Sequence, residues 1–151
     1  MSIKIHLKEA SIHDADLLLA WRNDEETRLA SHKTDVISAS EHKVWLQDTI
    51  SNPNRKLYLA EFSGESIGSV RADFCIESKT WELSWTLAPG KRGQGLAKHM
   101  VCTLAESIEG AVRAEIKQGN TASIRIAEFS GLSFSHSHND IRHYYRPALE
   151  N

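Results

Sequence analysis

Apolar and polar residues alternate along several short stretches of the chain, a period of two that is typical of strands with one buried face. The clearest stretch runs from Trp81 to Leu87, where apolar residues alternate with Glu82, Ser84 and Thr86. Further stretches, several of them bounded by turn residues, predict strands at residues 3–8, 57–62, 66–74, 111–116, 132–137 and 141–146. The pattern therefore predicts a sheet of about seven strands.

Apolar residues spaced three or four apart predict helices between these strands. The predicted helices begin at Ser11, at Ser40, near Gly95 and at Asn120, and they end at residues 21–26, at Asn52-Pro53, near Ile108 and at Gly131. The helix after Gly95 joins strand 81–87 to strand 111–116, so this pair is predicted to be parallel and the turn-linked pairs antiparallel. The order of elements predicts one α/β (α+β) domain, residues 1–151, on a mixed, mostly antiparallel sheet.

Composition and charge exclude several classes of protein. The 151 residues are 40% hydrophobic and 25% charged, and the net charge of −2 gives no reason to expect nucleic acid as a partner. The chain has neither a run of about eighteen apolar residues nor a signal-peptide pattern, so we expect a cytoplasmic protein without a membrane partner. Cys75 and Cys102 form no C-x-x-C pair, and the histidines at 136, 138 and 143 fit a polar surface better than a metal site.

A glycine loop follows the strand that ends at Leu87. It spans Arg92 to Ala97, with glycines at 93 and 95, and opens the third predicted helix. Such a loop leaves backbone N–H groups unpaired and lacks Cβ atoms that would block a ligand, which makes it an anion site. Arg92 and Lys98 add positive charge and favour a phosphate or pyrophosphate. The alternative is a tight turn in which the glycines only relieve backbone strain.

The loop and its flanks resemble the GCN5-related N-acetyltransferase (GNAT) family. Its R/Q-x-x-G-x-G/A signature is matched by Arg92, Gly93, Gln94, Gly95, Leu96 and Ala97. Glu82, seven residues before Pro89, and the Asn-x-x-Ser segment from Asn120 to Ser123 match as well. The resemblance covers nearly the whole chain and implies helices on both faces of the sheet and a central parallel pair that splays apart.

The same resemblance implies a cofactor site. The loop would cradle the pyrophosphate of acetyl-coenzyme A, the co-substrate, with Lys98 beside it. The backbone of Leu87 and the side chain of Asn120, with Ser123, would hold the pantetheine arm. Asparagine also suits a helix N-cap, so Asn120 has two candidate roles. No metal cofactor is implied.

Acetyl transfer to an amine needs a base, for which Glu82 is the candidate. We expect partial desolvation between Trp81 and Trp85 to raise its pKa, and a bridging water could relay the proton. The alternative is a strand residue that merely faces solvent. Many GNAT enzymes protonate the thiolate with a tyrosine where this chain has Ala127. Tyr144 and Tyr145 are the candidate acids; being adjacent on one strand, they point to opposite faces.

The acceptor is sought in two tryptophan-containing segments. Trp21, Arg22 and Asn23, together with residues 40–46, which contain His42 and Trp45, resemble the subgroup that acetylates the 4-amino group of a UDP-linked amino-dideoxy sugar in pseudaminic-acid biosynthesis. The tryptophans would form apolar walls and Arg22 would meet a diphosphate. The expected partner is thus a small-molecule amine, a sugar nucleotide.

Other functions stay open at this point. Similar segments occur in enzymes that acetylate ribosomal-protein N-termini or polyamines, and Asp24, Glu25 and Glu26 would suit a polyamine. The run of residues 21–26 is also typical of a solvated helix end, and a single histidine such as His42 is more often a surface group. The missing tyrosine at Ala127 keeps a non-catalytic coenzyme A-binding module in view. A homodimer is also left open.

Overall fold

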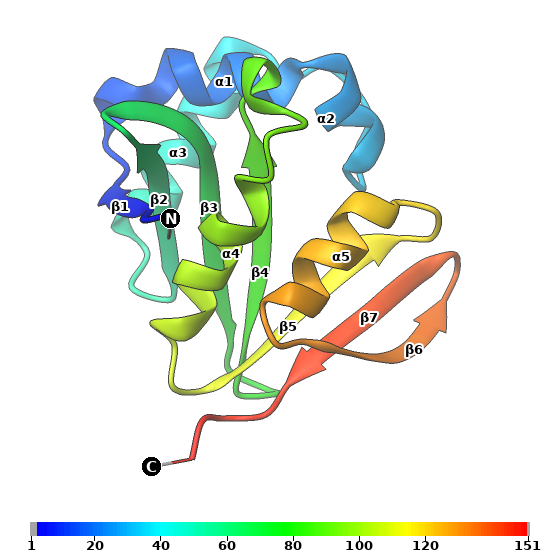
Figure 1. The fold of residues 1–151 in the computed structure, drawn as a ribbon. Helices are drawn as coiled ribbons and strands as arrows, with labels where there is room; N and C mark the ends of the chain where they lie inside the picture. Colours follow the sequence, from blue (N-terminus) through cyan, green and yellow to red (C-terminus); the bar gives the residue numbers. More distant parts are fainter. Residues whose placement is uncertain (1–2, 151) are drawn as a thin grey trace.

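The computed structural model describes residues 3–150. Its strands form one sheet in the order β1-β2-β3-β4-β5-β7-β6, in which only β4 and β5 run parallel (Figure 1). The strands are β1 His6–Glu9, β2 Arg55–Phe62, β3 Glu65–Cys75, β4 Thr80–Leu87, β5 Ala111–Lys117, β6 Ser133–His138 and β7 Ile141–Arg146. The expected mixed, mostly antiparallel sheet is confirmed.

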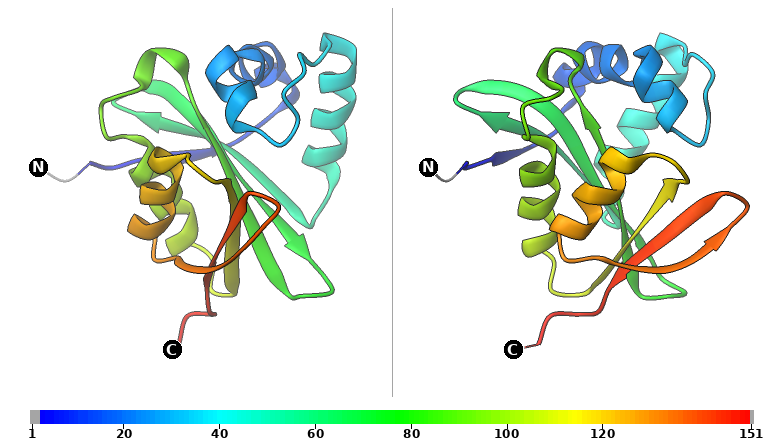
Figure 2. Two further views of the ribbon diagram at one scale, coloured as in Figure 1. Left: turned by 90° about the vertical axis from the view of Figure 1, so that its right-hand side faces the viewer. Right: turned by 45° about the vertical axis from the view of Figure 1, so that its right-hand side comes forward.

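Five α-helices and two short 3₁₀ helices accompany this sheet within residues 3–150. They are η1 Ile12–Asp14, α1 Ala15–Asn23, α2 Glu25–Ala30, α3 Ala39–Ser51, η2 Pro89–Lys91, α4 Ala97–Glu106 and α5 Thr121–Phe129. Figure 2 shows α4 and α5 on one face of the sheet and α1 to α3 on the other, so the prediction of helices on both faces is confirmed.

Each face of the sheet has its own hydrophobic core. Met100 and Leu104 of α4 pack with alternate residues of the central strands, such as Leu83 and Val112. On the other face, Leu18 and Trp21 of α1 and Leu46 of α3 pack on Leu59 of β2. Neighbouring strand residues point to opposite faces, so β2 contributes to both cores, whereas β3, β4 and β5 face the α1–α3 side with mainly polar residues such as Asp73, Glu82 and Arg113.

The parallel pair separates soon after it begins. β4 and β5 are paired only from Thr80 with Ala111 to Glu82 with Arg113, although β4 continues to Leu87. Beyond Glu82 the edge of β4 that faces β5 is therefore unpaired. The expected splay is confirmed, and its apex lies at Glu82.

Several predicted boundaries differ from the structure. The first helix ends at Asn23, within the run of residues 21–26 as predicted, but a second helix, α2, follows that was not predicted. Asp24 is its N-cap, because its side chain accepts a hydrogen bond from Thr27 N. Ser38, not Ser40, caps α3 by accepting from Glu41 N. β1 begins at His6 rather than Ile3. The two helix errors arise from local competition between caps, which apolar spacing does not resolve.

Candidate functional site

The loop between β4 and α4 has the geometry of an anion cradle. Gly93 and Gly95 have φ angles of +78° and +71°, which other residues rarely adopt. Leu96 gives α4 no side-chain cap. Among residues 3–150 no acceptor pairs with any amide from Gly93 to Lys98. This row of N–H donors, which also includes Gln94 and Ala97, fits a phosphate group, and we call it the amide cradle.

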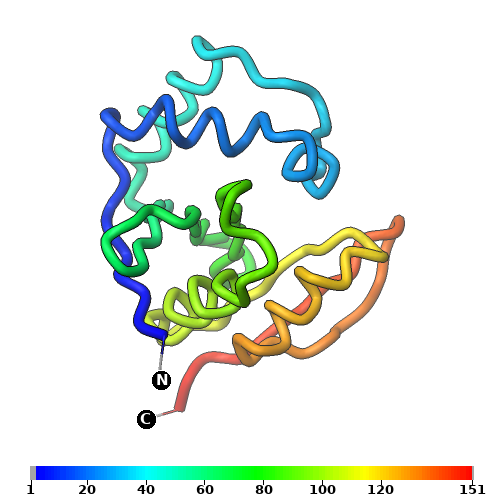
Figure 3. The backbone as a smooth tube through the Cα atoms, turned by 45° about the horizontal axis from the view of Figure 1, so that its top comes forward, coloured from blue at the N-terminus to red at the C-terminus, as the bar shows by residue number. Residues whose placement is uncertain are grey.

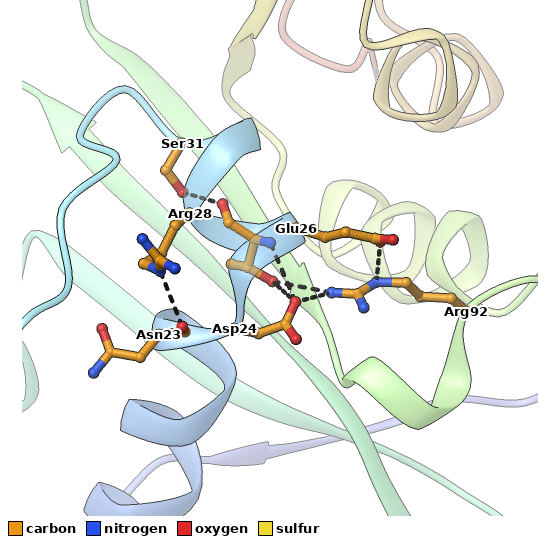
Figure 4. Close-up of polar contacts among 7 residues, drawn as sticks. Asn23, Asp24, Glu26, Arg28, Ser31 and Arg92 are labelled. Atoms are coloured by element: carbon orange, nitrogen blue, oxygen red, sulfur yellow. Dashed lines mark hydrogen bonds and ion pairs between the residues drawn. The ribbon is translucent and has the colours of Figure 1, made fainter.

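The basic side chains of this loop are paired within the protein. Arg92 Nη2 lies 2.5 Å from Asp24 Oδ2 and Arg92 Nε lies 3.0 Å from Glu26 Oε2 (Figure 4). The hydrogen bond from Arg92 is the main reason that the pKa of Asp24 is lowered. The ammonium of Lys98 lies 4.9 Å from the ring centre of Phe129. The sequence suggested that Arg92 adds positive charge to the cradle, whereas here α2 neutralises it.

Helix α2 bridges from the cradle to the end of β5. Arg92 holds its start, and Lys117 Nζ of β5 donates to Leu29 O over 2.9 Å at its end. Figure 3 shows α1 and α2 beside the loop that leads into α4. Through these two contacts α2 links the loop after β4 to the end of β5, the two strands that have separated.

Two residues expected to hold a pantetheine arm lie at element ends. Leu87 is the last residue of β4, where the strand edge toward β5 is unpaired, so its backbone can accept an added extended chain. Asn120 caps α5, because its Oδ1 accepts from Ser123 N over 3.2 Å. Asn120 therefore has the N-cap role, and the backbone N–H of Ser123 is the donor that it caps.

Glu82 lies at the apex of the splay, and its side chain is 29% exposed. Its Oε1 is 2.7 Å from Arg113 Nη2. Burial raises the pKa of Glu82; Arg113 opposes this rise, whereas Glu115 and Asp73 add to it. Tryptophan side chains were expected to cause the desolvation.

Those tryptophan side chains lie elsewhere. Trp81 and Trp85 pack on the α4 core, on the opposite face of β4 from Glu82. The polar groups around Glu82 come instead from β3 and β5. The direction of the Glu82 pKa and its main cause, burial, are as expected, but the neighbouring side chains that bury Glu82 are not the two tryptophans.

The two candidate tyrosines do point to opposite faces. Tyr144 is 1% exposed in the α4 core, and its hydroxyl accepts from Arg142 Nε over 3.1 Å, so we do not carry it forward as an acid. Tyr145 is 43% exposed and pairs in register with Arg113, on the face that carries Glu82. Ala127 is a residue of α5 and is fully buried in the core on the α4 side of the sheet.

The expected acceptor residues of α1 are largely structural. Trp21 is 6% exposed in the second core, so it offers no wall to a ligand. Asn23 exchanges two 2.8 Å hydrogen bonds with the backbone of Ile37. Arg22 Nη2 donates to Lys33 O over 2.9 Å, while its Nη1 is buried without a partner among the described residues. These side chains brace the segment between α2 and α3.

His42 and Trp45 of α3 lie together near this segment. His42 is 4% exposed, and burial, helped by the charge of Arg22, lowers its pKa. Its ring centre is 5.3 Å from that of Trp45, and the Arg71 guanidinium lies 5.3 Å from the Trp45 ring. Trp45 is therefore the expected acceptor residue that keeps a partly accessible aromatic surface beside a cationic group, that of Arg71.

Sequence reasoning missed the charged groups that surround Glu82. Arg71 and Asp73 of β3 and Arg113 and Glu115 of β5 all occupy alternate positions on the face of Glu82. Arg71 Nε donates to Asp73 Oδ2 over 3.0 Å. The alternation marked these positions as polar, but only the strand order shows that they meet. Within residues 3–150 no three metal-ligating side chains converge, and no helix is long and apolar enough to cross a membrane.

Solved structures share this fold at low sequence identity. A spermidine N-acetyltransferase from Vibrio cholerae, in complex with coenzyme A and spermine, aligns with a TM-score of 0.84 at 14% identity, covering 95% of both chains. A ribosomal L7/L12 alpha-N-protein acetyltransferase with coenzyme A gives 0.80 at 15% identity, covering 97% of this chain and 98% of the other. An aminoglycoside acetyltransferase with coenzyme A gives 0.79 at 15%, covering 95% of both.

A family match covers most of the chain, although no curated protein matches the chain. The model of the acetyltransferase (GNAT) domain matches residues 4–133, a span that contains β4, the amide cradle and α5. The chain therefore belongs to the acetyltransferase (GNAT) domain family.

Proposed function

We propose that this acetyltransferase transfers the acetyl group of acetyl-coenzyme A to the primary amine of a small polar acceptor, with Glu82 as the base. The observation that carries the proposal is a half-buried carboxylate of raised pKa at the apex of the splay. The same strand leads, at its other end, into the amide cradle. Family membership supports the reaction class.

The residues present fit the co-substrate. The amides from Gly93 to Lys98 would hold its pyrophosphate, and the unpaired edge of β4 up to Leu87 would hold its pantetheine arm. Gly93 and Gly95 keep Cβ atoms out of the cradle. When bound, acetyl-coenzyme A supplies an acetyl group activated as a thioester.

Proton movements can be assigned to side chains on one face. Glu82 takes a proton from the acceptor's ammonium, directly or through a water, which leaves a neutral nucleophilic amine. Arg113 holds the carboxylate in place at 2.7 Å. Tyr145, a partly exposed phenol on this face, is our candidate for protonating the leaving thiolate of coenzyme A, with water as the alternative donor.

For the acceptor we keep the 4-amino group of a UDP-linked amino-dideoxy sugar as the finer proposal. Trp21 and Asn23 no longer support it, because both are used within the fold. The support that remains is Arg71, whose guanidinium lies 5.3 Å from the centre of the Trp45 ring, since a guanidinium group and an aromatic ring suit a diphosphate and a base. The carboxylates that would favour a polyamine, Asp24 and Glu26, are paired with Arg92.

An acceptor panel tests the proposal. The protein is incubated with acetyl-coenzyme A and, separately, with the UDP-linked 4-amino sugar, spermidine or a ribosomal-protein N-terminal peptide, while release of free thiol is followed and products are weighed by mass spectrometry. We expect thiol release and a single added acetyl group with the amino sugar. Faster acetylation of spermidine or the peptide would overturn the sugar, and no acetylation of any amine by folded protein would overturn the reaction.

The ion pairs of Arg92 predict how coenzyme A affinity responds to charge. In Glu26→Gln, Arg92 loses one of its two carboxylate partners, and one negative charge leaves the neighbourhood of the cradle. We expect coenzyme A to bind about two- to fivefold more tightly at low salt, and the gain to shrink at high salt. Titration calorimetry at two ionic strengths measures this. The control, Glu25→Gln, lies in the same turn of α2 but outside the ion pairs of Arg92; equal effects of both variants would contradict the prediction.

A further inference from the structure

Helix α2 is held to the rest of the protein by polar contacts rather than by a hydrophobic core. None of its residues is buried, and its one large apolar side chain, Leu29, is 60% exposed. Its neighbours α1 and α3 contribute Leu18, Trp21 and Leu46 to the second core, whereas within residues 3–150 α2 adds no residue to either core. Elements held in this way open at a lower free-energy cost than the core does. The position of α2 therefore depends on a few side-chain contacts.

The start of α2 is held by Arg92. The Nη2 atom of Arg92 lies 2.5 Å from Asp24 Oδ2 and 3.3 Å from Thr27 Oγ1. Its Nε atom lies 3.0 Å from Glu26 Oε2 (Figure 4). These three acceptors belong to the N-cap and the first turn of α2, whereas Lys117 of β5 contacts the opposite end of the helix. Arg92 thus connects the start of α2 to the loop that leads into α4.

Arg92 also belongs to the loop that forms the amide cradle, which begins with the next residue. The other cations of this loop have partners of their own, since Lys91 pairs with Glu65 and Lys98 lies over the Phe129 ring. At Arg92 two carboxylates of α2 face one guanidinium, so this group of three side chains is net negative at neutral pH. An anion in the cradle therefore lies close to a cation that is already shared between two carboxylates.

A pyrophosphate bound in the cradle would change this balance of charge. Its oxygens can accept two hydrogen bonds from one guanidinium, and the Arg92 side chain starts one residue before the cradle. Its negative charge also repels the carboxylates of Asp24 and Glu26. Both effects act in the same direction, because the attraction of Arg92 and the repulsion of the two carboxylates each weaken the ion pairs. The pyrophosphate and α2 therefore compete for Arg92.

We propose that Arg92 is a latch on α2 that the cofactor opens: in the free protein it holds α2 through Asp24 and Glu26, and when coenzyme A is bound it turns to the pyrophosphate and releases the start of the helix. This inference rests on the proposed place of the pyrophosphate in the amide cradle. The released segment continues to His32, whose Nε2 lies 4.0 Å from Glu115 Oε1, on the face of the sheet that carries the candidate base. Cofactor binding therefore loosens the segment that borders this base.

Hydrogen exchange of the backbone amides at residues 27–31 tests the latch. The free protein, the protein with coenzyme A and the protein with pantetheine, which lacks the phosphates, are labelled from milliseconds upward and measured by mass spectrometry. We expect coenzyme A to slow exchange at residues 93–98 and to speed it in α2 about three- to tenfold, and pantetheine to leave α2 unchanged. A protected cradle without faster exchange in α2, or equal acceleration by pantetheine, would overturn the latch alone. A cradle that coenzyme A leaves unprotected would contradict the proposed cofactor site.

Two variants identify the side chain responsible. Arg92→Met removes the latch, so α2 should exchange rapidly in the free protein and gain no further speed from coenzyme A. Lys117→Met is the matched control, because it loosens the opposite end of α2 and should keep the acceleration by coenzyme A. Each variant is measured at coenzyme A concentrations that give full protection of the cradle. An Arg92→Met protein whose α2 still responds like that of the wild type would show that the release does not depend on Arg92, and would overturn the inference.

Discussion

Glu82→Gln is expected to lower kcat about 10²- to 10⁴-fold while leaving the affinity for coenzyme A nearly unchanged. Glutamine keeps the size of the side chain and can still face Arg113, but it cannot take a proton. The amide cradle lies at the far end of β4, so the cofactor contacts are untouched. Steady-state kinetics with the best acceptor of the panel, together with calorimetric titration of coenzyme A, separates the two effects.

The pH profile gives an independent check of the same role. Burial raises the pKa of Glu82, so the base form is lost as pH falls through a value above the ordinary range for glutamate. The acid limb of the wild-type rate profile should therefore lie above that range. Glu115 adds to the rise, so Glu115→Gln should move the acid limb to lower pH. An acid limb that Glu115→Gln leaves in place would argue against titration of Glu82.

The Glu82→Gln result also decides between an enzyme and a coenzyme A-binding module. A catalyst loses turnover and keeps its cofactor, whereas a module has no turnover to lose in either form. A variant with wild-type kcat would show that Glu82 is a structural partner of Arg113 and that the base lies elsewhere. The buried position of Ala127 bears on neither outcome, because the proposed proton donor, Tyr145, lies on the other face of the sheet.

Local patterns were sufficient to predict the framework of the site. The alternation through Trp81 to Leu87 gave β4, and the glycines at 93 and 95 marked a loop whose positive φ angles are observed. The crossover helix gave the parallel β4–β5 pair. These features depend on periods and turn preferences within a few residues of the chain, which a single sequence displays directly.

The partners of the site residues could not be predicted in this way. Arg92 meets Asp24 across 68 positions of sequence, and with Glu26 as a second partner its positive charge is compensated within the protein. The role of Trp21 could not be predicted for the same reason. An aromatic residue at a helix end fits a ligand-binding wall and a core position equally well in the sequence. Only the packing of α1 on β2, through Leu59, decides that it is core.

Arg146→Met is expected to destabilise the fold by roughly 3–5 kcal/mol. Arg146 is 9% exposed at the end of β7. Its guanidinium donates to three carbonyls that follow or close α4: Nη1 to Ala105 O over 2.8 Å, and Nη2 to Ile108 O over 2.7 Å and Gly110 O over 2.8 Å. Methionine fills a similar space but cannot donate: Ala105 O keeps its bond from Ile108 N, whereas Ile108 O and Gly110 O lose the Arg146 donor and remain as desolvated acceptors.

Urea and thermal unfolding measure this loss, which should lower Tm by roughly 10 °C for a chain of this size. Arg142→Met is the matched control on the same strand, because among residues 3–150 the Arg142 side chain hydrogen-bonds only the Tyr144 hydroxyl, and it lies over the Phe134 ring. Equal losses in both variants would show that side-chain packing, and not the carbonyl contacts, sets the stability. Since α4 begins at the amide cradle and Arg146 secures its other end, coenzyme A should restore part of the lost Tm by binding only the folded state.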